Sequence, residues 1–177
     1  HADLKAQLLP GYDFITDTRI AADGNGRDAD ALDVGDFTTA NQCGAGEAAQ
    51  SSSWHGTHVA GIAAASGHNA LGVSGVAMAA RILPVRVLGR CGGYSSDIAD
   101  AIVWAAGGSV NGVPANANPA RVLNLSLGGP GSCGITTQNA INAARARGAV
   151  VVVAAGNEAG NVAQSSPANC SGVVVVA

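Results

Sequence analysis

Two histidines stand at the start of a run of small apolar residues. In the segment Trp54–Ala65, His55 and His58 precede a stretch of glycine, alanine, valine and isoleucine, a composition that predicts a closely packed helix. The amide groups in the first turn of a helix lack intrahelical partners, and they lie at the positive end of the helix dipole. Because such an environment disfavours a charged imidazole, His58 is a candidate neutral base.

Other interpretations of the histidines are open. His55 and His58 have the spacing of two zinc ligands on one helical turn, but no His-Glu-x-x-His pattern and no third ligand are evident. A histidine on a small-residue helix can also be hydrogen-bonded inside the core. His68 is most simply a loop histidine.

Glycine-rich turns follow two of the predicted strands. Gly128 comes after one strand and Gly156-Asn157 after another. In open parallel sheets ligands collect at the carboxyl ends of the strands, so these turns and His58 can face one cleft. By itself, a glycine followed by asparagine is also an ordinary turn.

Three segments together resemble one protein family. His55–Ile62 reads His-Gly-Thr-His-Val-Ala-Gly-Ile and resembles the histidine motif of the subtilisin-like serine proteases. Val122–Gly129 resembles the substrate-binding strand of that family, and Val151–Glu158 resembles the strand that ends in its oxyanion-hole asparagine. The three segments also occur in the same order as in that family. The resemblance implies an α/β fold, in which helices flank both faces of a parallel β-sheet.

The resemblance assigns roles to individual residues. His58 would be the general base, Asn157 would donate its amide to the oxyanion, and His55 would be structural. Substrate would lie between two pocket walls and an opposing edge. The alternative interpretation is that the glycines of these segments only form turns. The walls comprise Ser126, Leu127, Gly128, Ala155 and Gly156, and the edge comprises Arg90, Gly92 and Tyr94. Such a protein is a secreted endopeptidase that acts through an acyl-enzyme on protein or peptide substrates.

Two members of the family's catalytic triad have no counterpart in the 177 residues. The nucleophile motif Gly-Thr-Ser-Met-Ala is missing, Ser126 does not follow such a motif, and Asp17-Thr18-Arg19 lacks the glycine of Asp-Thr-Gly. We therefore expect residues 1–177 to be the central portion of one catalytic domain, inactive alone. The rival interpretation is a non-catalytic calcium- or peptide-binding relic of the same fold.

An acidic segment, Asp23–Asp36, holds five carboxylates in 14 residues. Carboxylates on a flexible loop are suitable ligands for Ca²⁺, although the pattern is not an EF-hand. The subtilisin-like proteases, which this chain resembles, also commonly hold calcium in loops. An ordinary solvated loop is the alternative. The candidate ligands are Asp28, Asp30, Asp33 and Asp36.

The chain has four cysteines without Cys-x-x-Cys spacing, which favours two disulfides in a secreted protein over zinc ligands or free thiols. Three connectivities are possible. We favour Cys43 with Cys91 and Cys133 with Cys170, because each pair would tie loops on either side of one structural unit.

Composition excludes several classes of function. Nine scattered Lys and Arg and a net charge of −3 leave no basic stripe for nucleic acid, and no apolar run approaches a membrane span. The N-terminus has no signal-peptide layout, and no Gly-x-Gly-x-x-Gly turn of a nucleotide-binding domain stands between a strand and a helix. We expect a monomer.

The apolar pattern predicts alternating strands and helices. Such alternation predicts a parallel sheet with right-handed crossovers. The expected helices start near residues 56, 96 and 136, and the expected strands cover residues 12–15, 82–88, 121–127, 149–154 and 173–176.

Overall fold

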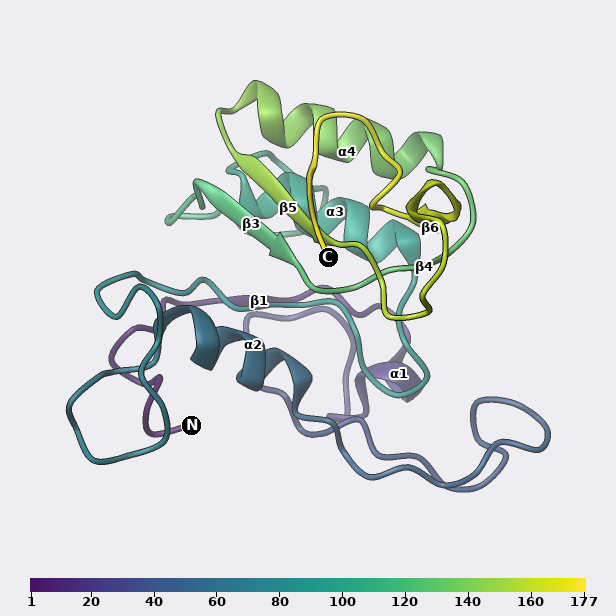
Figure 1. Ribbon diagram of the computed structural model, residues 1–177, viewed down its shortest axis with the longest axis horizontal. Helices are drawn as coiled ribbons and strands as arrows, with labels where there is room; N and C mark the ends of the chain where they lie inside the picture. Colours follow the sequence, from purple (N-terminus) through teal and green to yellow (C-terminus); the bar gives the residue numbers. More distant parts are fainter. The chain divides into compact units, whose positions relative to one another are not determined.

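A computed structural model describes residues 1–177. The chain divides into two compact units, His1–Tyr94 and Ser95–Ala177, which are described separately. Both combine helices with short parallel strands, as the sequence predicts (Figure 1). None of the helices is both long and apolar enough to span a bilayer.

The first unit is built on a two-stranded parallel sheet. Strands β1 (Tyr12–Asp13) and β2 (Val85–Arg86) pair in register, and an isolated bridge between Leu8 and Ile82 extends the contact. The residues after β1, Phe14 and Ile15, are buried and form the centre of this unit's core. The unit also holds α1 (Thr18–Ala21) and α2 (His55–Ala64).

Helix α2 is held by the loop that follows it. The N–H groups of residues 75, 76 and 77 donate to the carbonyls of Ala65, Ile62 and Ala63. A Cβ on Gly75 would lie 2.4 Å from the backbone nitrogen of Ala65, so only glycine allows this approach. The small residues of the helix therefore serve close backbone packing, as their composition predicts.

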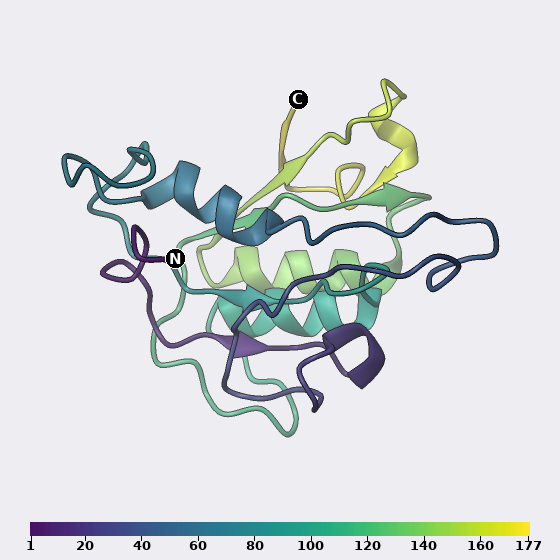
Figure 2. The same ribbon diagram turned by 90° about the horizontal axis from the view of Figure 1, so that it is seen from below.

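An arm projects from the first unit between α1 and α2 (Figures 1 and 2). Its two sides meet at Thr38 and Gln50, which exchange backbone hydrogen bonds of 2.9 and 3.0 Å. The disulfide between Cys43 and Cys91 ties the arm to the loop after β2. This bond, with Cys133–Cys170 in the other unit, confirms the predicted connectivity.

The second unit contains a three-stranded parallel sheet in the order β3-β5-β7. The strands are β3 (Val122–Leu125), β5 (Val150–Ala154) and β7 (Val174–Val176). Helices α3 (Ser95–Ala105) and α4 (Ile135–Ala146) pack together on one face of this sheet (Figures 1 and 2).

The core of this unit lies between the sheet and the two helices. The side chains of Ile141, Val151 and Val153 are at most 1% exposed. Trp104 on α3 is also buried, and its indole donates to the carbonyl of Pro114 at 2.7 Å. The core of this unit is thus mainly aliphatic, with one buried tryptophan.

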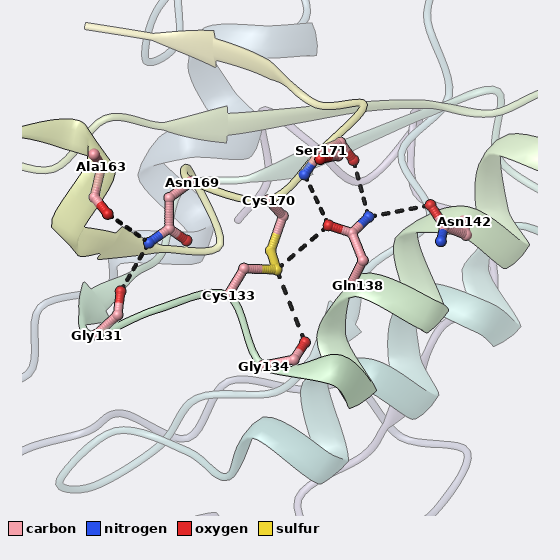
Figure 3. Close-up of a disulfide and its surroundings, with 9 residues drawn as sticks. All are labelled: Gly131, Cys133, Gly134, Gln138, Asn142, Ala163, Asn169, Cys170 and Ser171. Carbon is pink, nitrogen blue, oxygen red and sulfur yellow. Dashed lines mark hydrogen bonds between the residues drawn. A yellow bond between two sulfur atoms is a disulfide. The ribbon is translucent and has the colours of Figure 1, made fainter.

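The remaining elements of the second unit are short. Strands β4 (Gly129–Pro130) and β6 (Ser165–Ser166) form an antiparallel pair beside the parallel sheet, and η1 (Val162–Gln164) is a single 3₁₀ turn. Figure 3 shows how Cys133–Cys170 joins the start of α4 to the segment before β7. There Gln138 accepts from the N–H of Ser171 and donates to its carbonyl.

Two strand predictions need correction. The strand expected over residues 82–88 is limited to β2, because Pro84 has no N–H for the ladder. The strand expected to be buried over residues 173–176 is present as β7 (Val174–Val176), and its side chains are 40–53% exposed. A continuous run of valines cannot distinguish these two environments.

Candidate active site

His58 lies in the first turns of α2, four residues after Trp54. Its backbone N–H donates to the carbonyl of Trp54 at 3.0 Å, and its side chain is exposed. Exposure rules out the core interpretation of this histidine. The zinc interpretation also has no support, since no three His, Cys, Asp or Glu side chains form a group that could hold a metal ion.

The edge predicted to bind substrate follows β2 in the same unit as His58. Cys91 and Gly92 have positive φ values of 64° and 102°, and the N–H of Gly89 donates to the carbonyl of Gly92 at 2.9 Å. The guanidinium carbon of Arg90 lies 4.1 Å from the ring centroid of Phe37, at the base of the arm. The edge is therefore a tight turn braced by a cation–π contact and a disulfide.

Tyr94 ends this edge, and its ring is about half exposed. Its hydroxyl donates to Asp17 Oδ2 at 3.3 Å. Asp17 also accepts two hydrogen bonds from the Arg19 guanidinium, which hold the pKa of this carboxyl well below its ordinary value. The ionised carboxylate of Asp17 thus helps to orient the Tyr94 side chain through this hydrogen bond.

A pocket of about 120 Å³ lies in the second unit, at the carboxyl ends of β3 and β5. It brings together most of the residues predicted for the pocket walls and the predicted oxyanion donor. Ala155 is the exception, because it does not line the pocket. The lining comprises Ser126, Leu127, Gly128, Gly129, Ala154, Gly156, Asn157, Glu158 and Ser165.

The β4–β6 pair closes one side of this pocket. Gly129 pairs with Ser166, and a Cβ on Gly128 would lie 3.1 Å from the Ser166 carbonyl oxygen. A side chain at residue 128 would therefore push this wall apart. The neighbouring strand thus favours glycine at this position.

From the sequence, Glu158 with Ser165 and Ser166 indicates only a roomy or polar pocket; in the structure Glu158 is the charged side chain of the pocket lining. Its Oε2 accepts from the backbone N–H of Asn157 at 2.9 Å. A Cβ on Gly156 would lie 2.5 Å from the same oxygen, so glycine makes room for the carboxylate.

His58 and the edge at Arg90, Gly92 and Tyr94 belong to the first unit, and Asn157 with its pocket belongs to the second. The structure thus groups the predicted residues into two clusters. That they act together at one cleft stays a prediction.

The carboxylates of the acidic segment accept hydrogen bonds from backbone N–H groups. Asp28, Asp30 and Asp33 each accept from the N–H two residues further along, at 2.8 to 3.0 Å. Asp36 accepts from the N–H and the hydroxyl of Ser53. As arranged here the four carboxylates do not fit one calcium ion, and calcium binding at this segment stays a prediction.

A second pocket, lined by residues 68–74, lies at the loop after α2. Buried Asp3 accepts from the Asn69 side chain at 2.7 Å and from the N–H of Val73 at 3.0 Å. His68 is one lining residue of this loop. Its predicted place in a loop is confirmed.

Comparison with known proteins identifies the family. The model of the subtilase family, Peptidase S8, matches residues 1–177, which is the whole chain. The chain belongs to the subtilase family. The extracellular protease of Xanthomonas campestris pv. campestris is 65% identical to this subtilase over 177 residues, and the extracellular basic protease of Dichelobacter nodosus is 47% identical over 180.

Solved structures give the same result. A protease from Pseudoalteromonas arctica PAMC 21717 matches this subtilase with a TM-score of 0.98 and 63% identity over the whole chain. The S41 psychrophilic protease matches with a TM-score of 0.69 and 27% identity. The predicted subtilisin-like α/β fold is thereby confirmed. The chain spans 30% of the length of each curated relative and 52% and 48% of the two solved chains.

Proposed function

We propose that the intact protein is a secreted serine endopeptidase that hydrolyses peptide bonds through an acyl-enzyme. The observation that carries the proposal is the pocket in which Asn157 lies beside Ser126, Leu127 and Gly128. Membership of the subtilase family and the names of the extracellular relatives support it. Two disulfides suit an oxidising, extracellular compartment.

In the proposed reaction a serine from outside residues 1–177 attacks the carbonyl carbon of the scissile bond. His58 takes the hydroxyl proton, and the carbonyl oxygen becomes an anion in the tetrahedral intermediate. The side-chain amide of Asn157 donates a hydrogen bond to this anion. When the C–N bond breaks, His58 delivers its proton to the leaving amine and the acyl-enzyme remains. Water then attacks the ester, and His58 again moves the proton.

Both walls of the pocket can position the substrate backbone. Ser126 and Leu127 follow β3 directly, so an extended peptide can continue the sheet there as an added strand. The side chain before the scissile bond would then enter the pocket beside Gly156 and Glu158. Arg90, Gly92 and Tyr94 would form the opposing edge, which contacts residues further from the scissile bond.

Labelling by a fluorophosphonate probe tests the proposal on the intact protein. We expect labelling of the wild type, its loss in His58→Ala, and no labelling of residues 1–177 alone. Asn157→Ala should fold normally and lose about 10² to 10³ in kcat, a range measured on a subtilisin and so not independent of this family. A folded intact protein that neither reacts with the probe nor cleaves peptides would refute the protease and favour the non-catalytic relic.

Calcium remains a separate proposal for residues 28–36. Binding there requires the carboxylates of Asp28, Asp30, Asp33 and Asp36 to exchange their backbone partners for the ion. Calcium should then raise the Tm of the intact protein, and Asp30→Asn with Asp33→Asn should remove part of that rise. If calcium raises the Tm of this variant as much as that of the wild type, the ion binds elsewhere.

The remaining expectations concern partners. We propose protein or peptide substrates and a monomer that binds neither nucleic acid nor membranes. Size-exclusion chromatography with light scattering measures the oligomeric state. A concentration-dependent dimer would contradict the monomer without affecting the proposed chemistry.

A further inference from the structure

An exposed turn lies in the second unit after α3. The N–H of Val113 donates to the carbonyl of Val110 at 3.2 Å, and Asn111 and Gly112 occupy the two central positions. Gly112 has a φ of 74°, whereas Asn111 does not have a positive φ, which is the pattern of a type II turn. Both central residues are exposed to solvent.

We propose that Asn111–Gly112 is a site of spontaneous deamidation, with water as the co-reactant. The backbone nitrogen of Gly112 attacks Cγ of Asn111 and loses its proton, and the side-chain nitrogen leaves as ammonia. A five-membered succinimide results. Water then adds to one of its two carbonyls and breaks the adjacent C–N bond, giving aspartate or isoaspartate. The balance is one water consumed and one ammonia released.

The geometry leaves this step unobstructed. Neither the side chain of Asn111 nor the N–H of Gly112 makes a hydrogen bond, and a Cβ on Gly112 would meet no atom within 4 Å. Ring closure requires rotation about the backbone between the two residues, which glycine permits because it lacks a Cβ. The one hydrogen bond that the rotation breaks is the 3.2 Å turn contact, which is long for its type.

The chain provides an internal comparison, because Asn25–Gly26 has the same two residue types. Here the Asn25 amide donates to Asp28 Oδ2 at 2.6 Å, so the leaving group is held. A Cβ on Gly26 would lie 3.0 Å from the Thr16 carbonyl oxygen, so the backbone is packed against its neighbour. The fold therefore protects Asn25 and leaves Asn111 reactive.

The modification should leave the fold intact. On one side of the turn is α3, and on the other Pro114 accepts from the Trp104 indole at 2.7 Å. Asn116 donates to the carbonyls of Trp104 and Ala105 at 2.9 and 3.2 Å. Since both ends are anchored, the extra backbone methylene of isoaspartate is confined to the tip. The product carries one additional negative charge.

Ageing of the intact protein at mildly alkaline pH tests the proposal, with a fluorophosphonate present throughout to suppress proteolysis. Peptide mapping should show conversion of the Asn111 peptide, and an isoaspartyl methyltransferase with labelled S-adenosylmethionine should label that peptide. The Asn25 peptide should stay unmodified in the folded protein. In urea both peptides should convert, since unfolding removes the protection of Asn25.

Two variants complete the test. Asn111→Gln should abolish methyltransferase labelling of this peptide, and Gly112→Ala should slow it because a Cβ hinders rotation. Aged and fresh wild type should have the same Tm. No conversion at Asn111, or conversion of Asn25 at the same rate in the folded protein, would overturn the proposal.

Discussion

The carboxylate of Glu158 accepts a hydrogen bond from the backbone N–H of Asn157, with Oε2 2.9 Å from the nitrogen. The same oxygen lies over Gly156, where a Cβ would be only 2.5 Å away. An anionic group is therefore fixed in the wall of the pocket that is proposed to receive the substrate side chain. Its charge should bias which side chains enter.

Replacement of Glu158 by glutamine should change this bias. The intact wild type should favour lysine over glutamate before the scissile bond, and Glu158→Gln should reduce the ratio of their kcat/KM values by about fivefold, since partly exposed charge pairs contribute up to about 1 kcal/mol. Peptides that differ only at this residue provide the measurement, and an uncharged leucine peptide is the control. An unchanged ratio would show that the carboxylate does not face the substrate.

Arg86 on β2 should be a major determinant of stability in the first unit. Its side chain is 6% exposed, and it contacts the carboxylate of buried Asp13, Asp23 Oδ2 at 2.7 Å and the Ala21 carbonyl. Arg86→Ala should lower the unfolding free energy by about 3 to 5 kcal/mol, because it leaves a buried carboxylate without its partner.

Arg19 provides the matched control for this measurement by urea unfolding. It also pairs with an aspartate, Asp17, but its side chain is 86% exposed. Arg19→Ala should therefore change the unfolding free energy far less than Arg86→Ala does. Equal effects of the two substitutions would contradict the distinction between buried and exposed pairs.

The two disulfides should stabilise the fold to nearly the same extent. They close loops of 48 and 37 residues, and the chain-entropy model gives about 4 kcal/mol for each. Paired serine substitutions, Cys43 with Cys91 and Cys133 with Cys170, can be compared by urea unfolding. A much smaller loss for the Cys43–Cys91 pair would show that the arm is held mainly by the Arg90–Phe37 contact.

Asp36 should make stability depend on pH. Desolvation raises the pKa of its carboxyl, but hydrogen bonds from the Ser53 hydroxyl and N–H outweigh this and leave the pKa below its ordinary value. Because the pKa of Asp36 is lowered in the folded state, its carboxylate stabilises the fold at pH values above the unfolded-state pKa of about 3.9. This stabilisation is lost as the pH falls through the folded-state pKa.

Asp36→Asn should therefore destabilise the protein at neutral pH, and the difference from wild type should shrink as the pH falls below about 4. Ser53→Ala removes one of the two donors and should give a smaller effect with the same pH dependence. Urea unfolding at several pH values measures both. A difference that is constant with pH would assign the effect to packing.

The periodic elements of the second unit could be predicted from the sequence because apolar spacing determines which faces are buried. Ile141 and Ala144 on α4, three residues apart, are fully buried, and β5 lies within one residue of its expected range. Asp97 in the first turn of α3 is 2% exposed, a burial that an acidic residue near a helix start does not predict. Local propensity does not reveal such tertiary contacts.

The family, the alternation of strands and helices and the residues with chemistry to offer could be predicted from the sequence, whereas the sequence only favoured one of three disulfide pairings, which the structure confirms. The predictions follow from local spacing and from motifs of contiguous residues. The three-dimensional structure was needed to show that Glu158 accepts from the Asn157 N–H, and that the Asn25 side chain is hydrogen-bonded while that of Asn111 is not. Each of these depends on neighbours distant in the chain or on side-chain direction, which spacing alone cannot specify.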